Sequence, residues 1–126
     1  MHALLAVIFT DKPDNVPGAV AEALARYQVA EGQYPDPAQP LEMSSWEFGG
    51  NWSHLLGGNE GSARDLSRAL RVDGHYAPFR LLFPADLGHD DVIIEGGDRD
   101  TWAAILHKLD AYHEDSWAVV VDIHYA

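Results

Sequence analysis

The chain has 126 residues and a mass of 13.9 kDa, enough for one compact domain with its own core and too little for two. Its 47% hydrophobic and 22% charged residues are typical of a globular domain and exclude a disordered or collagen-like chain. With 8 basic and 20 acidic residues, the formal net charge is -12. Such a surface repels phosphate backbones and anionic lipid, so direct nucleic-acid binding is disfavoured.

The absence of cysteine excludes disulfides, thiolate metal sites and cysteine nucleophiles. This composition fits a reducing compartment, and we expect a cytoplasmic protein. The apolar run at residues 3–9 is too short to cross a membrane and has no basic residues before it. We therefore expect neither a signal peptide nor a membrane span.

The same run predicts the first element. Residues 3–9 are apolar at odd and even positions alike, which is typical of a central strand covered on both faces. Asn15 followed by Pro17 predicts the start of a helix, because the amide can accept free N–H groups and proline has none to offer. Its apolar face is spaced by three to four residues, and the helix ends before Gly32.

A proline-rich stretch at residues 34–40 predicts an extended loop. After it, residues 46–52 alternate between aromatic and polar side chains around a glycine pair, which predicts a strand with a turn or bulge. Ser62 followed by Asp65 resembles a capping box and predicts a short helix that ends at Asp73-Gly74.

The last third of the chain predicts two short strands, a helix and a final strand. The two strands fall at residues 79–83 and 92–95. Asp98 or Asp100 can cap the next helix, whose apolar face contains Trp102, Ile105, Leu106 and Leu109. Residues 117–125 predict a strand with one uniformly apolar face and a second face that changes from Ala118 and Val120 to Asp122 and His124.

Strands and helices in this order lack the regular alternation of a doubly wound sheet. We therefore predict a single α+β domain over residues 1–126, with a mainly antiparallel sheet and two or three helices. The closest specific arrangement is ferredoxin-like, with helices on one face of the sheet and the first and last strands as neighbours.

Three segments carry a resemblance to a known group of proteins. They are Met1-His2 before the apolar strand, the segment Trp46-Glu47-Phe48-Gly49-Gly50-Asn51-Trp52, and the ending Val121-Asp122-Ile123-His124. In these segments the chain resembles short, largely uncharacterised bacteriophage and bacterial proteins that carry an aromatic-x-x-Gly-Gly-Arg-Trp segment, and Asn51 stands in place of the arginine. The resemblance covers about a fifth of the chain and implies no activity, but it implies that these segments belong together.

The final strand holds the candidate catalytic residues, Asp122 and His124. Being two apart on a strand, they leave the same face, and an antiparallel first strand would bring His2 to them. A carboxylate with two imidazoles is a ligand set for zinc, iron or manganese, so the candidate metal ligands are His2, Asp122 and His124. The same residues could form an Asp-oriented histidine general base, or simply the polar end of a strand.

The candidate ligand-binding residues are Trp46, Gly49, Gly50, Asn51 and Trp52. The glycine pair could let a ligand approach the main chain, although an ordinary turn is the simpler interpretation. The two tryptophans could form an aromatic platform for a base or a sugar, and the alternative is a core position for at least one of them.

Two functions follow from these observations. The first is a small acidic cytoplasmic binding protein of phage-accessory or immunity type that docks on a basic protein partner through complementary charge. The second is a small metal-dependent or general-base enzyme that uses Asp122 and His124. The sequence requires no cofactor, and a divalent transition metal is the one that this site would take. The apolar C-terminal strand could also pair across a dimer if it lies at a sheet edge.

Overall fold

The computed structural model describes residues 2–30, 33, 41–73, 79–84, 92–96, 99–110 and 116–124. Six strands form one sheet: β1 (His2–Phe9), β2 (Ser45–Phe48), β3 (Glu60–Ser62), β4 (Phe79–Phe83), β5 (Val92–Gly96) and β6 (Trp117–His124). The α-helices are α1 (Val16–Leu24), α2 (Ala63–Asp73) and α3 (Arg99–Asp110), and three short 3-10 turns are η1 (Ala25–Tyr27), η2 (Gly50–Trp52) and η3 (Gly57–Asn59).

The sheet is mixed and mostly antiparallel, with the strand order β2-β6-β1-β4-β5. β1 pairs in parallel with β4, and the other strand pairs are antiparallel. β3 pairs with β6 beside residues 117–119, and β2 pairs with it beside residues 121–124. The predicted α+β class is therefore confirmed, and the first and last strands are neighbours as expected.

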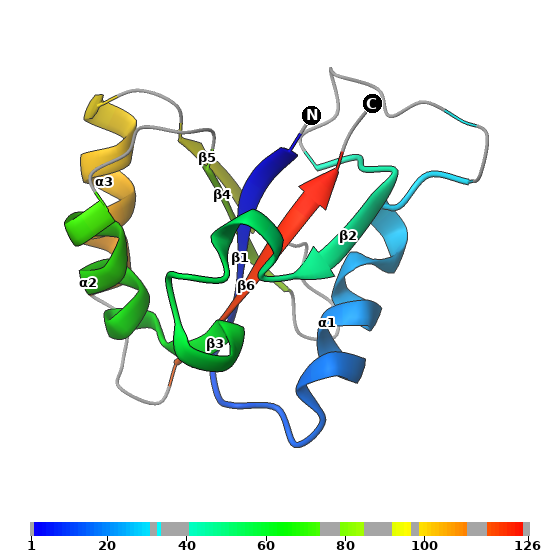
Figure 1. Cartoon of the computed structure of the whole chain (residues 1–126), viewed down its shortest axis with the longest axis horizontal. Coiled ribbons are helices and arrows are strands. Elements are labelled where there is room, and N and C mark those ends of the chain that lie inside the picture. The colour runs from blue at the N-terminus through cyan, green and yellow to red at the C-terminus, as the bar shows by residue number, and fades with distance from the viewer. Residues whose placement is uncertain are drawn as a thin grey trace.

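The helices lie on both faces of the sheet (Figure 1). One buried cluster joins α1 to the face that carries Leu5, Val7 and Val121. A second buried cluster joins α2 and α3 to the opposite face. A ferredoxin-like arrangement with helices on one face is therefore not confirmed, because α1 covers the face opposite α2 and α3.

β6 lies inside the sheet, because β1 pairs with one of its edges while β2 and β3 pair with the other. The prediction that this strand could pair across a dimer is therefore wrong: both of its hydrogen-bonding edges are occupied. The apolar sequences of β1 and β6 follow from this central position, since both strands are covered on both faces.

Local capping sets the starts of two helices. The Asn15 side chain accepts a hydrogen bond from the Gly18 backbone N–H at 3.2 Å, which confirms the predicted start of α1. The Ser62 hydroxyl accepts one from the Asp65 backbone N–H at 3.0 Å, which confirms the predicted start of α2. In the described residues, no helix is long and apolar enough to cross a membrane.

Two features did not follow from the sequence. Leu41 and Met43 are buried against the α1 face, and β3 adds a short strand before α2. Several predictions lie outside the described residues: the loop at residues 34–40, the cap at Asp98, the end of the last strand at Tyr125, and the side chains of Trp102 and Ile105.

Candidate functional site

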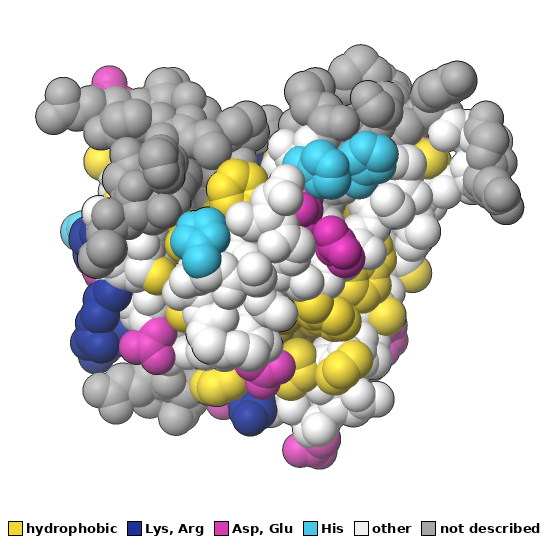
Figure 2. Space-filling model, viewed as in Figure 1, with side chains coloured by type: hydrophobic (Ala, Val, Ile, Leu, Met, Phe, Trp, Pro, Cys, Tyr) yellow, Lys and Arg dark blue, Asp and Glu magenta, His cyan; other side chains and the backbone are white. Residues whose placement is uncertain are grey.

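The candidate site lies where β1 begins and β6 ends. His2 and His124 are directly opposite one another in the antiparallel pair, as expected if the two strands are neighbours. Side chains alternate along a strand, so His2 and Asp122 share the face on which Leu4 and Val120 pack toward α2 and α3. Figure 2 shows histidine and acidic side chains gathered over this end of the sheet.

Asp122 is paired with His2. Asp122 Oδ1 lies 2.9 Å from His2 Nδ1, and its Oδ2 accepts a hydrogen bond from the Asn51 backbone N–H, also at 2.9 Å. The Asp122 residue is 2% exposed, whereas the His2 side chain is 46% exposed. Both oxygens of a buried carboxylate are thus held, one by a side chain that reaches solvent and one by the main chain.

The sequence places Asp122 and His124 on one face of the strand, with His2 joining them from the first strand, and does not say which histidine pairs with Asp122. In the structure, however, Asp122 is opposite Leu4, one position diagonal from His2 across the β1–β6 pair. A long side chain such as histidine can reach across to its diagonal neighbour on the adjacent strand. The His2 ring does so, and its Nδ1 meets the Asp122 carboxylate. His2 is therefore the histidine that Asp122 orients.

His124 lies against the His2 ring. The ring centroids are 4.7 Å apart and the planes are tilted by 35°. The His124 carbonyl accepts hydrogen bonds from the Ser44 backbone N–H at 2.9 Å and from the Ser44 hydroxyl at 2.8 Å. These bonds fix the end of β6 beside β2, and the pairing of β1 with β6 sets His2 opposite His124.

The glycine pair brings the chain over Asp122. Gly50 has a φ of +51°, and a Cβ at this residue would lie 2.5 Å from Asp122 Cβ and 2.8 Å from Glu47 Oε1. Gly49 has a φ of +68° and packs on the Asn59 side chain. Since glycine has no side chain, the turn can lie close enough to β6 for the Asn51 N–H to reach the carboxylate.

A hollow of about 290 Å³ opens at this site, lined by His2, Ser45, Trp46, Glu47, Asp122 and His124. Sequence reasoning missed Ser45 and Glu47. Both follow from the pairing of β2 with β6, which sets Ser45 opposite His124 and Glu47 opposite Asp122. The alternation of β2 was visible in the sequence, but its register against β6 was not.

The predicted aromatic platform is not formed. Trp46 packs against the buried cluster on the α1 side of the sheet, and its ring meets Phe48 edge-on at 5.1 Å. Trp52 packs against the cluster on the α2 and α3 side. The two indoles lie on opposite faces because they follow different backbone segments, β2 and the turn η2, so they cannot stack on one ligand.

The three predicted metal ligands come together, but in an arrangement that does not suit a metal. Nδ1 of His2 and both oxygens of Asp122 are already engaged in hydrogen bonds. Within the described ranges, no group of three His, Asp or Glu side chains is placed to hold a metal ion. The donor set fits an oriented histidine better than a coordination sphere.

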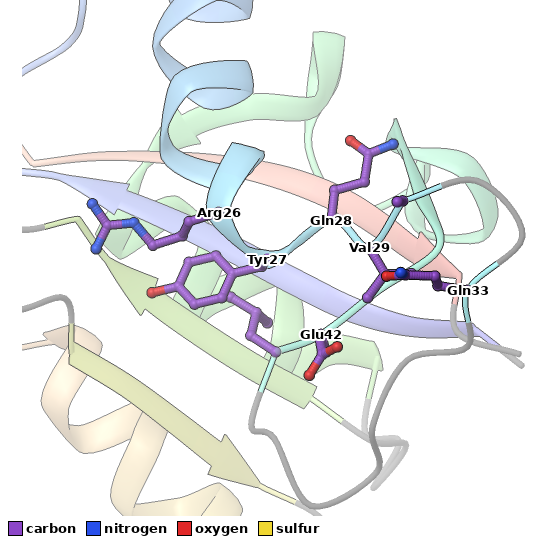
Figure 3. Close-up of a pocket in the computed structure, with 8 residues that line it drawn as sticks. Arg26, Tyr27, Gln28, Val29, Gln33 and Glu42 are labelled. Carbon is purple, nitrogen blue, oxygen red and sulfur yellow. The ribbon is translucent and has the colours of Figure 1, made fainter.

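A larger hollow of about 430 Å³ lies beyond the end of α1 and is lined by residues 26–30, 33 and 41–42. Figure 3 shows its polar side chains, Arg26, Gln28 and Glu42, pointing in different directions. A binding site needs a few polar groups that converge on the ligand. The hollow beside His2 has such groups, so it is the stronger candidate.

No protein-family model, curated protein or solved structure matches the chain. The resemblance to short bacteriophage and bacterial proteins therefore stays a prediction. The structure does show that the segments named for it meet at one place, because His2, the Gly49-Gly50-Asn51 turn and Asp122 are in contact.

Proposed function

We propose that this protein is a small enzyme that uses His2 as a general acid–base catalyst. The observation that carries the proposal is the 2.9 Å hydrogen bond between His2 Nδ1 and the buried Asp122 carboxylate. A carboxylate accepts hydrogen bonds and cannot donate them, so the proton of this bond belongs to Nδ1. Neutral His2 then has its lone pair on Nε2, the nitrogen available to a substrate.

The arrangement supports proton transfer in both directions. His2 Nε2 would take a proton from a water molecule or a substrate hydroxyl, and Asp122 would stabilise the imidazolium that forms. Asp122 keeps its position because the Asn51 N–H holds its second oxygen. A carboxylate held in this way fixes both the tautomer and the orientation of its histidine.

His124 would act as the second proton site. The ring centroids are 4.7 Å apart, so one bound substrate can meet both imidazoles. The protons balance when neutral His2 takes the proton of the attacking water and His124, in its protonated form, gives its own proton to the leaving group; exchange with solvent then restores both rings. The pair therefore fits a reaction that needs both a base and an acid, such as hydrolysis of an ester.

The test is hydrolysis of p-nitrophenyl esters of carboxylic acids by the wild-type protein, His2→Gln and Asp122→Asn. Loss of a positioned general base lowers turnover by about 10²-fold to 10⁴-fold, so both variants should lose nearly all activity. His107→Gln, on the exposed side of α3, is the matched control and should keep it. Wild-type turnover no faster than that of His2→Gln would overturn the proposal.

A second candidate function is docking on a basic protein partner, favoured by the distribution of charge. An ion pair or another contact is made by each of Lys12, Arg26, Arg64, Arg68, Arg71 and Arg80. By contrast, Asp11, Asp14 and Glu22 are exposed without an ion-pair partner among the described residues. Exposed acidic side chains without an ion-pair partner can bind the lysine and arginine side chains of a basic protein surface. A pull-down at low and high salt tests this candidate.

A further inference from the structure

We infer that the hollow beside His2 takes a ligand with a positively charged group, an ammonium or a guanidinium, and that Glu47 selects it. The inference rests on the proposed function, since it names the substrate class of the same site. Glu47 lines the hollow and is exposed. No described residue forms a hydrogen bond or an ion pair with its side chain.

The two carboxylates beside the hollow, Asp122 and Glu47, differ in their hydrogen-bond partners. Both oxygens of Asp122 already have hydrogen-bond partners, His2 and the Asn51 N–H, so this carboxylate is not free to bind a ligand. Glu47 sits opposite Asp122 in the β2–β6 pair, and Gly50 brings the backbone close to both side chains. Two carboxylates thus share this wall: the oxygens of Asp122 are hydrogen-bonded, and those of Glu47 have no partner among the described residues.

No described lysine or arginine lines the hollow. A cationic partner for Glu47 would therefore come from a ligand, and the net charge of -12 attracts cations to the whole molecule. A bound ammonium or guanidinium at Glu47 would place the neighbouring atoms of the ligand beside the two imidazoles. An anionic group there would instead meet Glu47 and Asp122 as like charges.

The experiment is a titration of the wild-type protein with methylguanidinium, N-methylurea and acetate, monitored by the imidazole C–H resonances of His2 and His124. Methylguanidinium should shift both sets of resonances to saturation, while neutral N-methylurea and anionic acetate should leave them unchanged. In Glu47→Gln the dissociation constant for methylguanidinium should rise about fivefold, as for loss of a partly exposed ion pair.

Glu22→Gln is the matched control, because it removes the same charge from the exposed surface of α1, away from the hollow. Its dissociation constant should equal that of the wild type. Saturation by acetate rather than methylguanidinium, or an equal effect of Glu22→Gln and Glu47→Gln, would overturn the inference.

The titration measures binding and does not depend on catalytic turnover, so it separates this inference from the proposed function. Ester hydrolysis without methylguanidinium binding would overturn the inference alone, and binding without hydrolysis would overturn the proposed function alone.

Discussion

At Gly50 the backbone passes close to two side chains of the candidate site. Its positive φ and the nearby Asp122 and Glu47 side chains leave no room for a Cβ. Gly58 has a positive φ of +68° as well, but nothing lies within 4 Å of the position of its Cβ. The two glycines thus separate the effect of backbone conformation from the effect of steric contact.

Gly50→Ala should lower the free energy of unfolding by about 3 kcal/mol, from left-handed backbone strain together with overpacking. Gly58→Ala should lower it by about 1 kcal/mol, from the backbone strain alone. Urea unfolding of both variants measures the difference. Equal losses of unfolding free energy in the two variants would show that steric contact with Asp122 adds nothing to the effect of Gly50→Ala.

At the residue scale, the sequence predicted which side chains gather but not how they pair. The alternation of residues 117–125 placed Asp122 and His124 on one face, and the expected antiparallel neighbour brought His2 to them. The choice of His2 as the partner of Asp122 depends on a diagonal contact between twisted strands. Glu47 was missed because its place depends on the register of a second strand pair.

Polar contacts join helices α2 and α3. Arg71 Nη2 donates to Asp110 Oδ2 at 2.6 Å, and the buried Ser67 hydroxyl donates to Asp110 Oδ1 at 2.7 Å. The Arg71 and Ser67 hydrogen bonds lower the pKa of Asp110 from 3.8 to about 2. Arg71 also offsets the unfavourable position of a carboxylate at the end of a helix.

A carboxyl group with a lowered pKa in the folded state stabilises the protein above its unfolded pKa, and this stabilisation is lost as the pH falls. The α2–α3 contact should therefore weaken between pH 3.8 and about 2. Asp110→Asn should make the stability of the protein less dependent on pH over this range. Chemical unfolding at a series of pH values measures it, with Asp14→Asn as the exposed control. Equal pH dependence in Asp110→Asn and the wild type would contradict the prediction.

The cap of α2 gives a second prediction for an element. Ser62→Ala removes the hydroxyl that accepts from the Asp65 N–H and should lower the free energy of unfolding by about 1 kcal/mol. Ser53→Ala, at an exposed position in a turn, should change it by less than about 0.5 kcal/mol. Thermal or urea unfolding distinguishes the two, and a neutral Ser62→Ala would show that the cap adds no stability.

At the scale of the whole molecule, local sequence patterns predicted the helices and strands but not which face of the sheet each helix covers. Apolar periodicity and caps predicted β1, α1, α2 and β6, because those signals lie within a few neighbouring residues. The side of the sheet that each helix covers depends on contacts between distant segments, and so the ferredoxin-like arrangement was not confirmed. Leu41 and Met43 were missed as core residues because they lie in a segment without helical or strand periodicity.

The net charge of -12 predicts a salt-dependent association with a basic protein. In a pull-down, such a partner should be retained at low ionic strength and released at high ionic strength. The combined variant Asp11→Asn, Asp14→Asn and Glu22→Gln should retain less of it at low salt. Equal retention at both salt concentrations would contradict docking driven by charge.

The central claim is that Asp122 holds His2 with its proton on Nδ1 and leaves Nε2 free. Long-range ¹H–¹⁵N correlation spectra of the imidazole side chains, recorded where His2 is neutral, test it without a substrate. We predict the Nδ1–H tautomer for His2 in the wild type and in His107→Gln, and loss of that preference in Asp122→Ala. A wild-type His2 that carries its proton on Nε2 would contradict the account.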